Sequence, residues 1–572
     1  MKKIAMMTVK GAVGLLPKSV KARLKDNHKL TEFYSRSLQR SGLFYGFPSK
    51  KKRMALYGAY LKKQNQALKS FSGNDSASRT LFLVVLGKKQ SEQTLSSAEE
   101  SGILSERIFV VNAKSSANSN NEFSSICEAV ADIPASSGVL IVNSGDTLVE
   151  EASDIFASSG ADADIFYCDT DKFDKKGKRT SPHFLPDWNP DLLFSTAYVN
   201  TGVMFSAELI KGIASQETTI AGLLAKIAVH KKDIIIRHIP YTLVHRGKDS
   251  PKERALNEIT CVLNETGKPV SVYDKELGIN HVQWPVLSNP LVSLIIPTRN
   301  GKELVQACIE SILQKTTYNN FEILLIDNGS DEQESIDYFK KLSQEPQIRV
   351  LSYPGEFNYS AINNFGVQHA RGEVVGLINN DIEVIKPEWL TYMLGHALRD
   401  DVGCVGAKLL YSDGRVQHAG VVLGYGGGAG HAHKYFPRYH PGYLKRLIAT
   451  QNYSAVTAAC LLVKKSKFIE VGGLNEKDLT VAFNDVDFCL RVRETGVRNL
   501  YCAEAELYHH ESVSRGLDLS PEKAARFKKE LDYLQVQWCD YIQHDPAYSP
   551  NLTLKRENFS VKTKEEFSES GN

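Results

Sequence analysis

Three short apolar runs in the second half of the chain each end in a cluster of polar residues. The runs read SLII, ILLI and VVGLI, and the clusters that follow them begin at Pro297, Asp327 and Asn379. Apolar runs of this length, bounded by turn residues, are typical of buried parallel strands. In an open α/β sheet the ligand lies outside the carboxyl ends of such strands. The sequence therefore predicts that polar side chains far apart in the chain meet at one edge of one sheet.

The composition is that of a folded protein with more than one domain. The chain has 572 residues, 42% hydrophobic and 24% charged, and this length predicts two or three domains. Its nine cysteines are scattered without a C-x-x-C pair, which favours reduced thiols in a cytoplasmic protein over disulfides or a zinc site. No apolar stretch approaches the roughly 20 residues of a spanning helix. Lys10 interrupts the first apolar run too early for a signal peptide.

Strand and helix signals divide the chain into five segments. The runs LFLVVLG, RIFVVNA and GVLIVNSGD alternate with helical stretches, and this pattern predicts a first parallel sheet. A second α/β pattern starts at Leu291. The segments are a basic helical segment at 1–70, an α/β domain at 75–250, a bridge at 251–290, a second α/β domain at 291–545, and a polar, loose tail at 546–572.

Residues 1–70 concentrate the positive charge. They hold 17 Lys and Arg against two acidic residues, so they carry +15, and the net charge of +3 leaves −12 for the rest. Cations mixed with apolar residues suit a helix on an anionic lipid surface. A solvated basic arm is the alternative. Nucleic-acid binding is disfavoured because the body is acidic and has no recognised nucleic-acid motif. The apolar residues are Leu15, Leu16, Leu24, Leu30, Phe33, Tyr34, Leu43, Phe44 and Tyr45.

The strand-end clusters supply two candidate carboxylates. Asp327 offers only acceptors and can receive the N3–H of a uracil or thymine ring, although a helix N-cap is an equally weighted role for it. Asp381 and the Asn380 carbonyl suit a hard divalent cation, which a diphosphate leaving group needs. Asn364 and Arg371 precede the third strand, and they either position ribose or phosphates or serve as turn and surface residues.

A fourth cluster, at residues 484–487, predicts the start of a helix. Asn484 can cap this helix, with Asp485 and Asp487 in its first turn, where negative charge is favoured. In the alternative reading Asp485 is a general base that takes the proton of an acceptor hydroxyl. His509 or His510, after the strand-like AELY, is a candidate metal ligand.

With these motifs in place, the chain resembles a known family. Residues 291–516 are similar to the glycosyltransferase family 2 domain with the GT-A fold, in particular to bacterial polysaccharide and O-antigen transferases. This resemblance implies an inverting, metal-dependent transferase that uses a nucleotide-diphosphate sugar, with Mn²⁺ or Mg²⁺ as cofactor. The matching segments are SLIIPTRN, EILLIDNGS, FNYSAINNFGVQHARGE, LINNDIEVI, HAGVVLG, NYSAVTAACLLV, VGGLN, AFNDVDFCLRVR and ELYHHESVSRG.

The resemblance also implies roles for single residues. The metal motif reads Asn379-Asn380-Asp381, with one carboxylate instead of two, and the base motif reads Asn484-Asp485 where many relatives have Glu-Asp. The implied roles are donor binding by Pro297, Thr298, Arg299, Asp327, Asn364, Arg371 and Asn380, metal binding by Asp381 and His509, and base catalysis by Asp485, with Asp487, His510 and Arg515 as weaker candidates.

The segment 75–250 resembles the same family more faintly. Only Asp146, in VLIVNSGDTL, remains of the metal motif, the strand LFLVVLGKK lacks the Pro-Thr-x-Asn turn, and AGLLAKIAVHKKD carries no base motif. This resemblance implies a degenerate GT-A-like copy that binds or scaffolds.

These observations lead to the hypothesis of a peripheral membrane glycosyltransferase. It is expected to move a sugar from a nucleotide donor to a growing, lipid-linked polysaccharide or O-antigen glycan at the cytoplasmic face of the cell membrane. The alternatives are a soluble transferase acting on a protein or small acceptor, and a non-catalytic glycan- or nucleotide-binding subunit. The sugar, the linkage, and association with itself or with other polysaccharide-assembly enzymes are left open.

Overall fold

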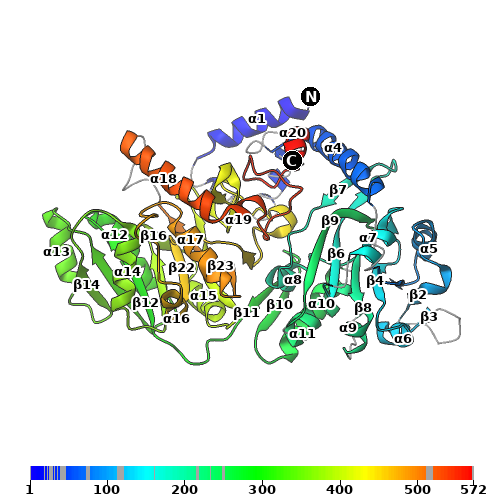
Figure 1. Ribbon diagram of the computed structural model, residues 1–572. Coiled ribbons are helices and arrows are strands. Elements are labelled where there is room, and N and C mark those ends of the chain that lie inside the picture. Colours follow the sequence, from blue (N-terminus) through cyan, green and yellow to red (C-terminus); the bar gives the residue numbers. More distant parts are fainter. Residues whose placement is uncertain are drawn as a thin grey trace. The chain divides into compact units, whose positions relative to one another are not determined.

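The computed structural model consists of two compact units, with the elements labelled in Figure 1. The C-terminal unit comprises Gln283–Ala547 with Met1–Ser49 and Leu554–Phe559, and the N-terminal unit comprises Lys50–Val282 with Tyr548–Thr553 and Ser560–Asn572. No helix among the described residues is long and apolar enough to cross a membrane. The described residues are 2–17, 20, 21, 24, 30, 33, 34, 37, 38, 47–71, 78–112, 122–159, 162–213, 218–231, 233–247, 252–510 and 520–569.

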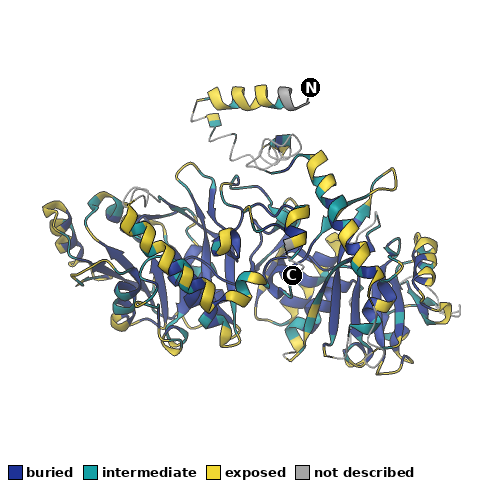
Figure 2. Cartoon of the chain, turned by 45° about the horizontal axis from the view of Figure 1, so that its top comes forward, coloured by how far each residue is buried: buried dark blue, intermediate teal, exposed yellow. Residues whose placement is uncertain are grey.

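A mixed sheet forms the centre of the C-terminal unit, in the order β14-β13-β12-β15-β22-β17-β23-β16. The three apolar runs form β12, β13 and β15, which are parallel as predicted, and Figure 2 shows the strands as mostly buried. The strands are β12 (Val292–Thr298), β13 (Phe321–Asp327), β14 (Ile348–Ser352), β15 (Val374–Ile378), β16 (Ile382–Val384), β17 (Val402–Leu410), β18 (Val416–His418), β21 (Gln451–Tyr453), β22 (Cys460–Lys464) and β23 (Arg498–His509), with β19 (Val421–Leu423) and β20 (Ala429–His431) in a separate pair.

Helices pack on both faces of this sheet. Leu294 and Ile296 of β12 share one core cluster with apolar residues of α12, α13 and α15. Ile295 points to the other face, where a Cβ on Gly366 of α14 would lie 2.5 Å from its Cγ2 atom, so this crossing requires glycine. The helices are α12 (Lys302–Lys315), α13 (Gln333–Leu342), α14 (Tyr359–His369), α15 (Trp389–Ala397), α16 (Lys465–Glu470), α17 (Asn484–Glu494), α18 (Pro521–Gln537) and α19 (Cys539–Gln543), with α1 (Lys2–Leu15) near the N-terminus.

The N-terminal unit contains a second sheet, in the order β3-β2-β1-β4-β8-β6-β9-β5. Its strands are β1 (Leu81–Leu86), β2 (Ile108–Val111), β3 (Glu122–Phe123), β4 (Gly138–Asn143), β5 (Thr147–Leu148), β6 (Ile165–Phe173), β7 (Arg179–His183), β8 (Val203–Ser206) and β9 (Ile236–His245), with a hairpin of β10 (Val270–Asp274) and β11 (Ile279–Gln283). Its helices are α4 (Lys50–Lys69), α5 (Ser91–Glu100), α6 (Ile126–Val130), α7 (Ala152–Ser158), α8 (Pro190–Thr196), α9 (Ala207–Lys211), α10 (Ile220–His230), α11 (Lys252–Glu265) and α20 (Lys564–Glu569).

The two sheets have the same topology. In each, the first strand pairs in parallel with the second and fourth, and the fourth pairs antiparallel with a later strand, β8 in one unit and β22 in the other. In each, a short strand after the fourth pairs antiparallel with the end of a long strand, β5 with β9 and β16 with β23. The expected N-terminal copy of the fold is therefore present, and equivalent positions can be assigned strand by strand.

Three expected segment boundaries differ from the structure. Most of the expected bridge is structured within the N-terminal unit, because α11 buries Leu256 and Ile259 and β10 pairs with β11. The tail is not loose, because residues Tyr548–Thr553 and Ser560 onward join the N-terminal unit. There the Asn551 amide donates to Asp169 Oδ2 at 3.0 Å. The basic segment is divided as well, since α4 buries one face in the N-terminal unit.

Candidate functional site

The carboxyl ends of β12, β13 and β15 bring the predicted donor-site residues together. Thr298 and Asp327 are paired neighbours at the ends of β12 and β13. The side-chain Nδ2 of Asn380 donates to Thr298 Oγ1 at 3.0 Å, which links the residues after β15 to the end of β12. Pro297 and Thr298 are buried, whereas Arg299 is half-exposed and pairs with Asp331 at 3.5 Å. These strand ends therefore form one polar edge, as the sequence predicted.

Asp327 is held in a fixed orientation by the turn that follows it. Its Oδ1 atom accepts from the Ser330 amide at 3.0 Å and from Ser330 Oγ at 2.6 Å. Ser330 Oγ in turn accepts from the Asn300 amide at 2.8 Å, which joins the loops after β12 and β13. Asp327 is thus an acceptor at the end of its strand and stabilises a turn. It is not a helix N-cap, because α13 begins at Gln333 with Glu332 in the cap position.

Asp381 and His509 face each other because of one strand pairing. β16 begins with Ile382, which is the partner of His509 at the end of β23, so Asp381 is placed beside the histidine. His509 Nε2 lies 3.1 Å from Asp381 Oδ1 and 3.1 Å from the Asn379 amide nitrogen. On the other side of the ring, Nδ1 lies 2.6 Å from Gln417 Oε1. The predicted pair is therefore assembled, and Gln417 fixes the orientation of the imidazole.

The donor set of this pair fits a divalent cation. With Nδ1–H donated to the Gln417 carbonyl, Nε2 presents its lone pair to a carboxylate oxygen 3.1 Å away. A metal ion bound between these two electron-rich atoms would offset the repulsion between them. No group of three or more His, Cys, Asp or Glu in the described part of the chain is arranged to hold a metal. Diphosphate oxygens and waters would have to complete the coordination of such an ion.

Asp485 lies at the start of α17, partly buried and bonded to the main chain. Its Oδ2 atom accepts from the Ala458 amide at 3.0 Å and its Oδ1 atom from the Val486 amide at 2.9 Å. Burial raises the pKa of Asp485, although these hydrogen bonds oppose the shift. A raised pKa makes the carboxylate a better proton acceptor, which is what a general base requires.

A continuous chain of contacts joins Asp485 to the Asp381–His509 pair. The Ala458 carbonyl, on the residue whose amide donates to Asp485, accepts from the Tyr359 hydroxyl at 3.1 Å. That hydroxyl lies 3.2 Å from Asn379 Oδ1, and the Asn379 amide nitrogen lies 3.1 Å from His509 Nε2. The candidate base and the candidate metal pair therefore belong to one site.

Two predicted donor residues lie elsewhere. Arg371 precedes β15 and sits at its amino end, where the neighbouring Gly372 amide donates to Ser293 at the start of β12. This is the opposite edge of the sheet from Asp381, so Arg371 is not a donor residue. Asn364 exchanges hydrogen bonds of 2.9 Å with the main chain of Leu474 in both directions, so its amide holds this loop.

The weaker candidates also have other partners. Asp487 accepts from Arg491 Nε at 2.9 Å and from the Trp538 indole at 2.9 Å, so it fixes the helix rather than serving the site. His510 contacts Ser412 Oγ at 2.7 Å and Glu383 Oε2 at 3.1 Å, and it does not join His509 on Asp381. Arg515 lies outside the described residues.

The structure adds two residues that the sequence reasoning missed. Gln417 comes from β18, directly before the family-like HAGVVLG segment, and only the fold places it on His509. Tyr359 begins α14 and links the metal pair to the Asp485 region. Its segment FNYSAINN was part of the family resemblance, which is the signal that could have drawn attention to it.

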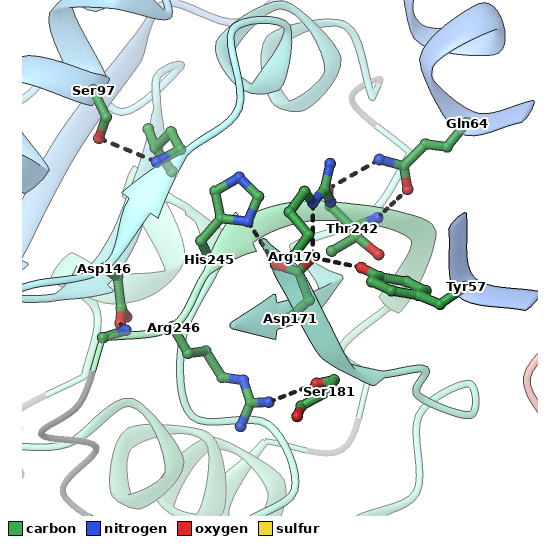
Figure 3. Close-up of polar contacts among 12 residues, drawn as sticks. Tyr57, Gln64, Ser97, Asp146, Asp171, Arg179, Ser181, Thr242, His245 and Arg246 are labelled. Atoms are coloured by element: carbon green, nitrogen blue, oxygen red, sulfur yellow. Dashed lines mark hydrogen bonds and ion pairs between the residues drawn. The ribbon is translucent and has the colours of Figure 1, made fainter. Parts of the chain in front are cut away.

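The equivalent positions in the N-terminal unit are Asp146, before β5, and His245, at the end of β9 (Figure 3). Asp146 accepts from the Gly247 amide at 2.7 Å and from Thr201 Oγ1 at 2.5 Å. His245 Nδ1 is 2.5 Å from Asp171 Oδ1, and Asp171 also accepts from Arg179 Nε at 2.7 Å and from the Tyr57 hydroxyl of α4 at 2.5 Å. Both residues are thus engaged in hydrogen bonds within their own unit.

The C-terminal unit is thus an α/β unit with aspartates at or just after the carboxyl ends of its parallel strands. Residues 293–472 match the model of the family described as Glycosyl transferase family 2. This matched segment lies within the C-terminal unit.

Two relatives match most of this chain. The uncharacterized protein y4gI of Sinorhizobium fredii is 45% identical over 420 residues, which are 70% of this chain and 46% of the relative. The O-antigen biosynthesis protein RfbC of Myxococcus xanthus is 33% identical over 419 residues, 68% of this chain and 31% of the relative. The chain thus spans less than half the length of either relative.

A solved structure gives a weaker similarity. The mannosyltransferase PcManGT of Pyrobaculum calidifontis, in complex with GDP-Man and Mn²⁺, shares 14% identity with a TM-score of 0.34, over 46% of this chain and 67% of that one. A TM-score this low adds nothing to the fold assignment, which rests on the sheet topology and the family match.

Proposed function

We propose that the chain transfers a sugar, with inversion, from a nucleotide-diphosphate donor to a hydroxyl of a growing glycan. The observation that carries this proposal is the single site formed by Asp485 and the Asp381–His509 pair, linked through Asn379 and Tyr359. A proton acceptor and a cation-binding pair at one sheet edge are what displacement of a diphosphate by an alcohol requires.

Each residue has a defined task in this reaction. Asp327 accepts a hydrogen bond from the donor base, and the partly buried Thr298–Asn380 contact joins the neighbouring strand ends. Asp381 and His509 would hold a divalent ion, which would neutralise charge on the leaving diphosphate. Asp485 takes the proton of the acceptor hydroxyl as the oxygen attacks the anomeric carbon. Its raised pKa suits that transfer.

The N-terminal unit is proposed to bind or scaffold and not to catalyse. It repeats the sheet topology, but Asp146 is engaged by Gly247 and Thr201, and His245 is engaged by Asp171. The segment equivalent to the Asp485 helix is α10, which carries no acidic residue in its first turn. A carboxylate in the position of Asp485 is what an inverting transferase would need there.

The acceptor is proposed to be a lipid-linked polysaccharide or O-antigen glycan at the inner face of the cell membrane. A similar protein of Myxococcus xanthus is named for O-antigen biosynthesis. Helix α1 has no acidic residue in its first turn and exposes Met7, Val9 and Leu15, the last of them 89% exposed (Figure 2). Exposed apolar side chains on a basic helix favour contact with an anionic lipid surface.

The test is a donor panel with the purified full chain. Release of nucleotide diphosphate is measured for each sugar nucleotide with Mn²⁺, with Mg²⁺ and in excess chelator. We expect release from one donor class, abolished by the chelator and restored by the metal. Donor binding without release from any sugar nucleotide, with acceptor glycan present, would indicate a non-catalytic binding subunit. Full release in chelator would remove the metal from the proposal.

A further inference from the structure

A basic pocket lies on the N-terminal unit between helix α4 and the turn that precedes β7. The pocket has a volume of about 540 Å³ and is lined by Lys50, Lys51, Met54, Ala55 and Lys178. Lys50 and Lys51 form the first turn of α4, and Lys178 is the last residue before β7. Figure 1 shows α4 beside β7. All five residues belong to one unit.

The pocket's helical wall is fixed by the opposite face of α4. Tyr57, Tyr60, Gln64 and Leu68 are buried. The Tyr57 hydroxyl donates to Asp171 Oδ2 at 2.5 Å, and the Gln64 side chain both donates to the Thr242 carbonyl at 3.2 Å and accepts from its amide at 2.8 Å (Figure 3). With this face anchored on the sheet, the first turn of the helix presents exposed lysines.

The second wall is a rigid turn between β6 and β7. Asp174 Oδ1 accepts from the main-chain amides of Lys176 at 2.8 Å and of Lys178 at 3.0 Å. The Asp174 carboxylate is therefore engaged in hydrogen bonds within the turn. These main-chain hydrogen bonds lower its pKa, and the nearby lysine charges lower it further. It is the carboxylate closest in sequence to Lys178. Among the described residues, Lys50 and Lys51 form no ion pair with any carboxylate.

Three lysines line one hollow, and a bound anion would offset the repulsion between their charges. A phosphate group carries the matching charge and accepts hydrogen bonds from several lysines at once. Met54 and Ala55 add apolar surface beside the cations, which suits a ligand with carbon next to its phosphate. A polynucleotide is disfavoured because the chain after residue 70 carries −12 and would repel it.

We propose that this pocket binds the phosphate headgroup of an anionic membrane lipid, so that the first turn of α4 and the β6–β7 turn dock the N-terminal unit on the membrane. The exposed Lys175 and Lys176 of the same turn extend the cationic surface around the pocket. This inference deepens the proposed peripheral location by naming its contact site. Removal of residues 1–70 is unsuited to test this inference, because that truncation would take away the buried face of α4.

The experiment uses the full chain and vesicles of phosphatidylcholine with or without 30% phosphatidylglycerol, about 0.1 M salt and sedimentation as the readout. The variant is K50Q/K51Q/K178Q, which removes three charges and keeps long side chains. Each lysine near such a surface contributes about 1 kcal/mol, so we expect affinity for the anionic vesicles to fall by roughly 100-fold. The matched control is K211Q/K231Q/K268Q, three exposed lysines elsewhere on the same unit, with an expected change of less than about 3-fold.

Three outcomes overturn the proposal. Equal sedimentation of the variant and the wild type would place the lipid contact elsewhere. Equal losses of vesicle affinity in the variant and the control would show that binding depends on net charge and not on this pocket. Binding of inorganic phosphate to the wild type, without any binding to vesicles, would indicate that the ligand is a soluble phosphate. Nucleotide release, measured without vesicles, is expected to be unchanged in K50Q/K51Q/K178Q, so failure here is separate from failure of the proposed glycosyl transfer.

Discussion

Glu506 is predicted to be the strongest electrostatic anchor of the strand that carries His509. Its carboxylate lies 2.9 Å from Lys408 Nζ and 2.6 Å from Arg438 Nη2, with its side chain only 8% exposed. Burial opposes ionisation of this group, but the Lys408 ammonium and the Arg438 guanidinium prevail and lower the pKa of Glu506 from 4.5 to about 2. Lys408 and Glu506 are also paired residues on the neighbouring strands β17 and β23, so this ion pair links the two strands.

The magnitude follows from that shift. A change in the pKa of Glu506 from 4.5 to about 2 corresponds to about 3 kcal/mol of stability at neutral pH. Glu506→Gln removes the charge and leaves the buried Lys408 and the partly buried Arg438 without their carboxylate, so we expect a loss of about 3 kcal/mol. That loss lowers the Tm of the C-terminal unit by roughly 6–12 °C. The exposed control Glu345→Gln should change stability by less than about 0.5 kcal/mol.

The pH dependence has a definite sign. The folded-state pKa is depressed, so the stabilisation is present above the ordinary carboxyl pKa and is lost as pH falls through it toward about 2. Urea unfolding of wild type and Glu506→Gln at pH 7 and pH 3.5 should therefore show a gap that narrows by more than about 1 kcal/mol. A gap below about 1 kcal/mol at pH 7, or one that does not change with pH, would refute the reasoning.

Two further predictions concern the site. Asp485→Asn should lower turnover by roughly 100-fold or more with donor affinity unchanged. Because burial raises the pKa of Asp485 and the base must be ionised, wild-type turnover should fall on the acid side at a pH above the ordinary carboxyl value of 3.8, and the variant's residual rate should lack this limb. Gln417→Leu should raise the Mn²⁺ concentration for half-maximal activity by roughly 10–100-fold, and Gln417→Glu should not. Near-normal turnover in the first variant, or unchanged metal dependence in the second, would contradict these roles.

Much of the site was predictable because strand ends converge by topology. The apolar runs before Pro297, Asp327 and Asn379 formed the expected strands, and the residues after them meet at one edge. The same logic explains the error at Arg371. A residue just before a parallel strand lies at its amino end, on the edge opposite to the ligand, and Arg371 lies there.

Long-range contacts were beyond the sequence pattern. The burial of the tail depends on partners such as Asn551 with Asp169, 382 residues apart. The placement of Gln417 on His509 depends on β18 pairing with β17. Neither relation leaves a periodicity in the chain. The polar composition of the tail predicted a loose segment, but its polar groups form hydrogen bonds with the unit that it joins.

We propose that the C-terminal unit alone performs the transfer, with Asp381 at the donor diphosphate. Nucleotide diphosphate release by Asp381→Asn and Asp146→Asn, compared side by side with added Mn²⁺, tests it most directly, with thermal unfolding confirming that both variants fold. We predict that Asp381→Asn loses at least about 100-fold in rate and that Asp146→Asn stays within about 2-fold of wild type. A full rate for Asp381→Asn, or a matching loss in a folded Asp146→Asn, would contradict the account.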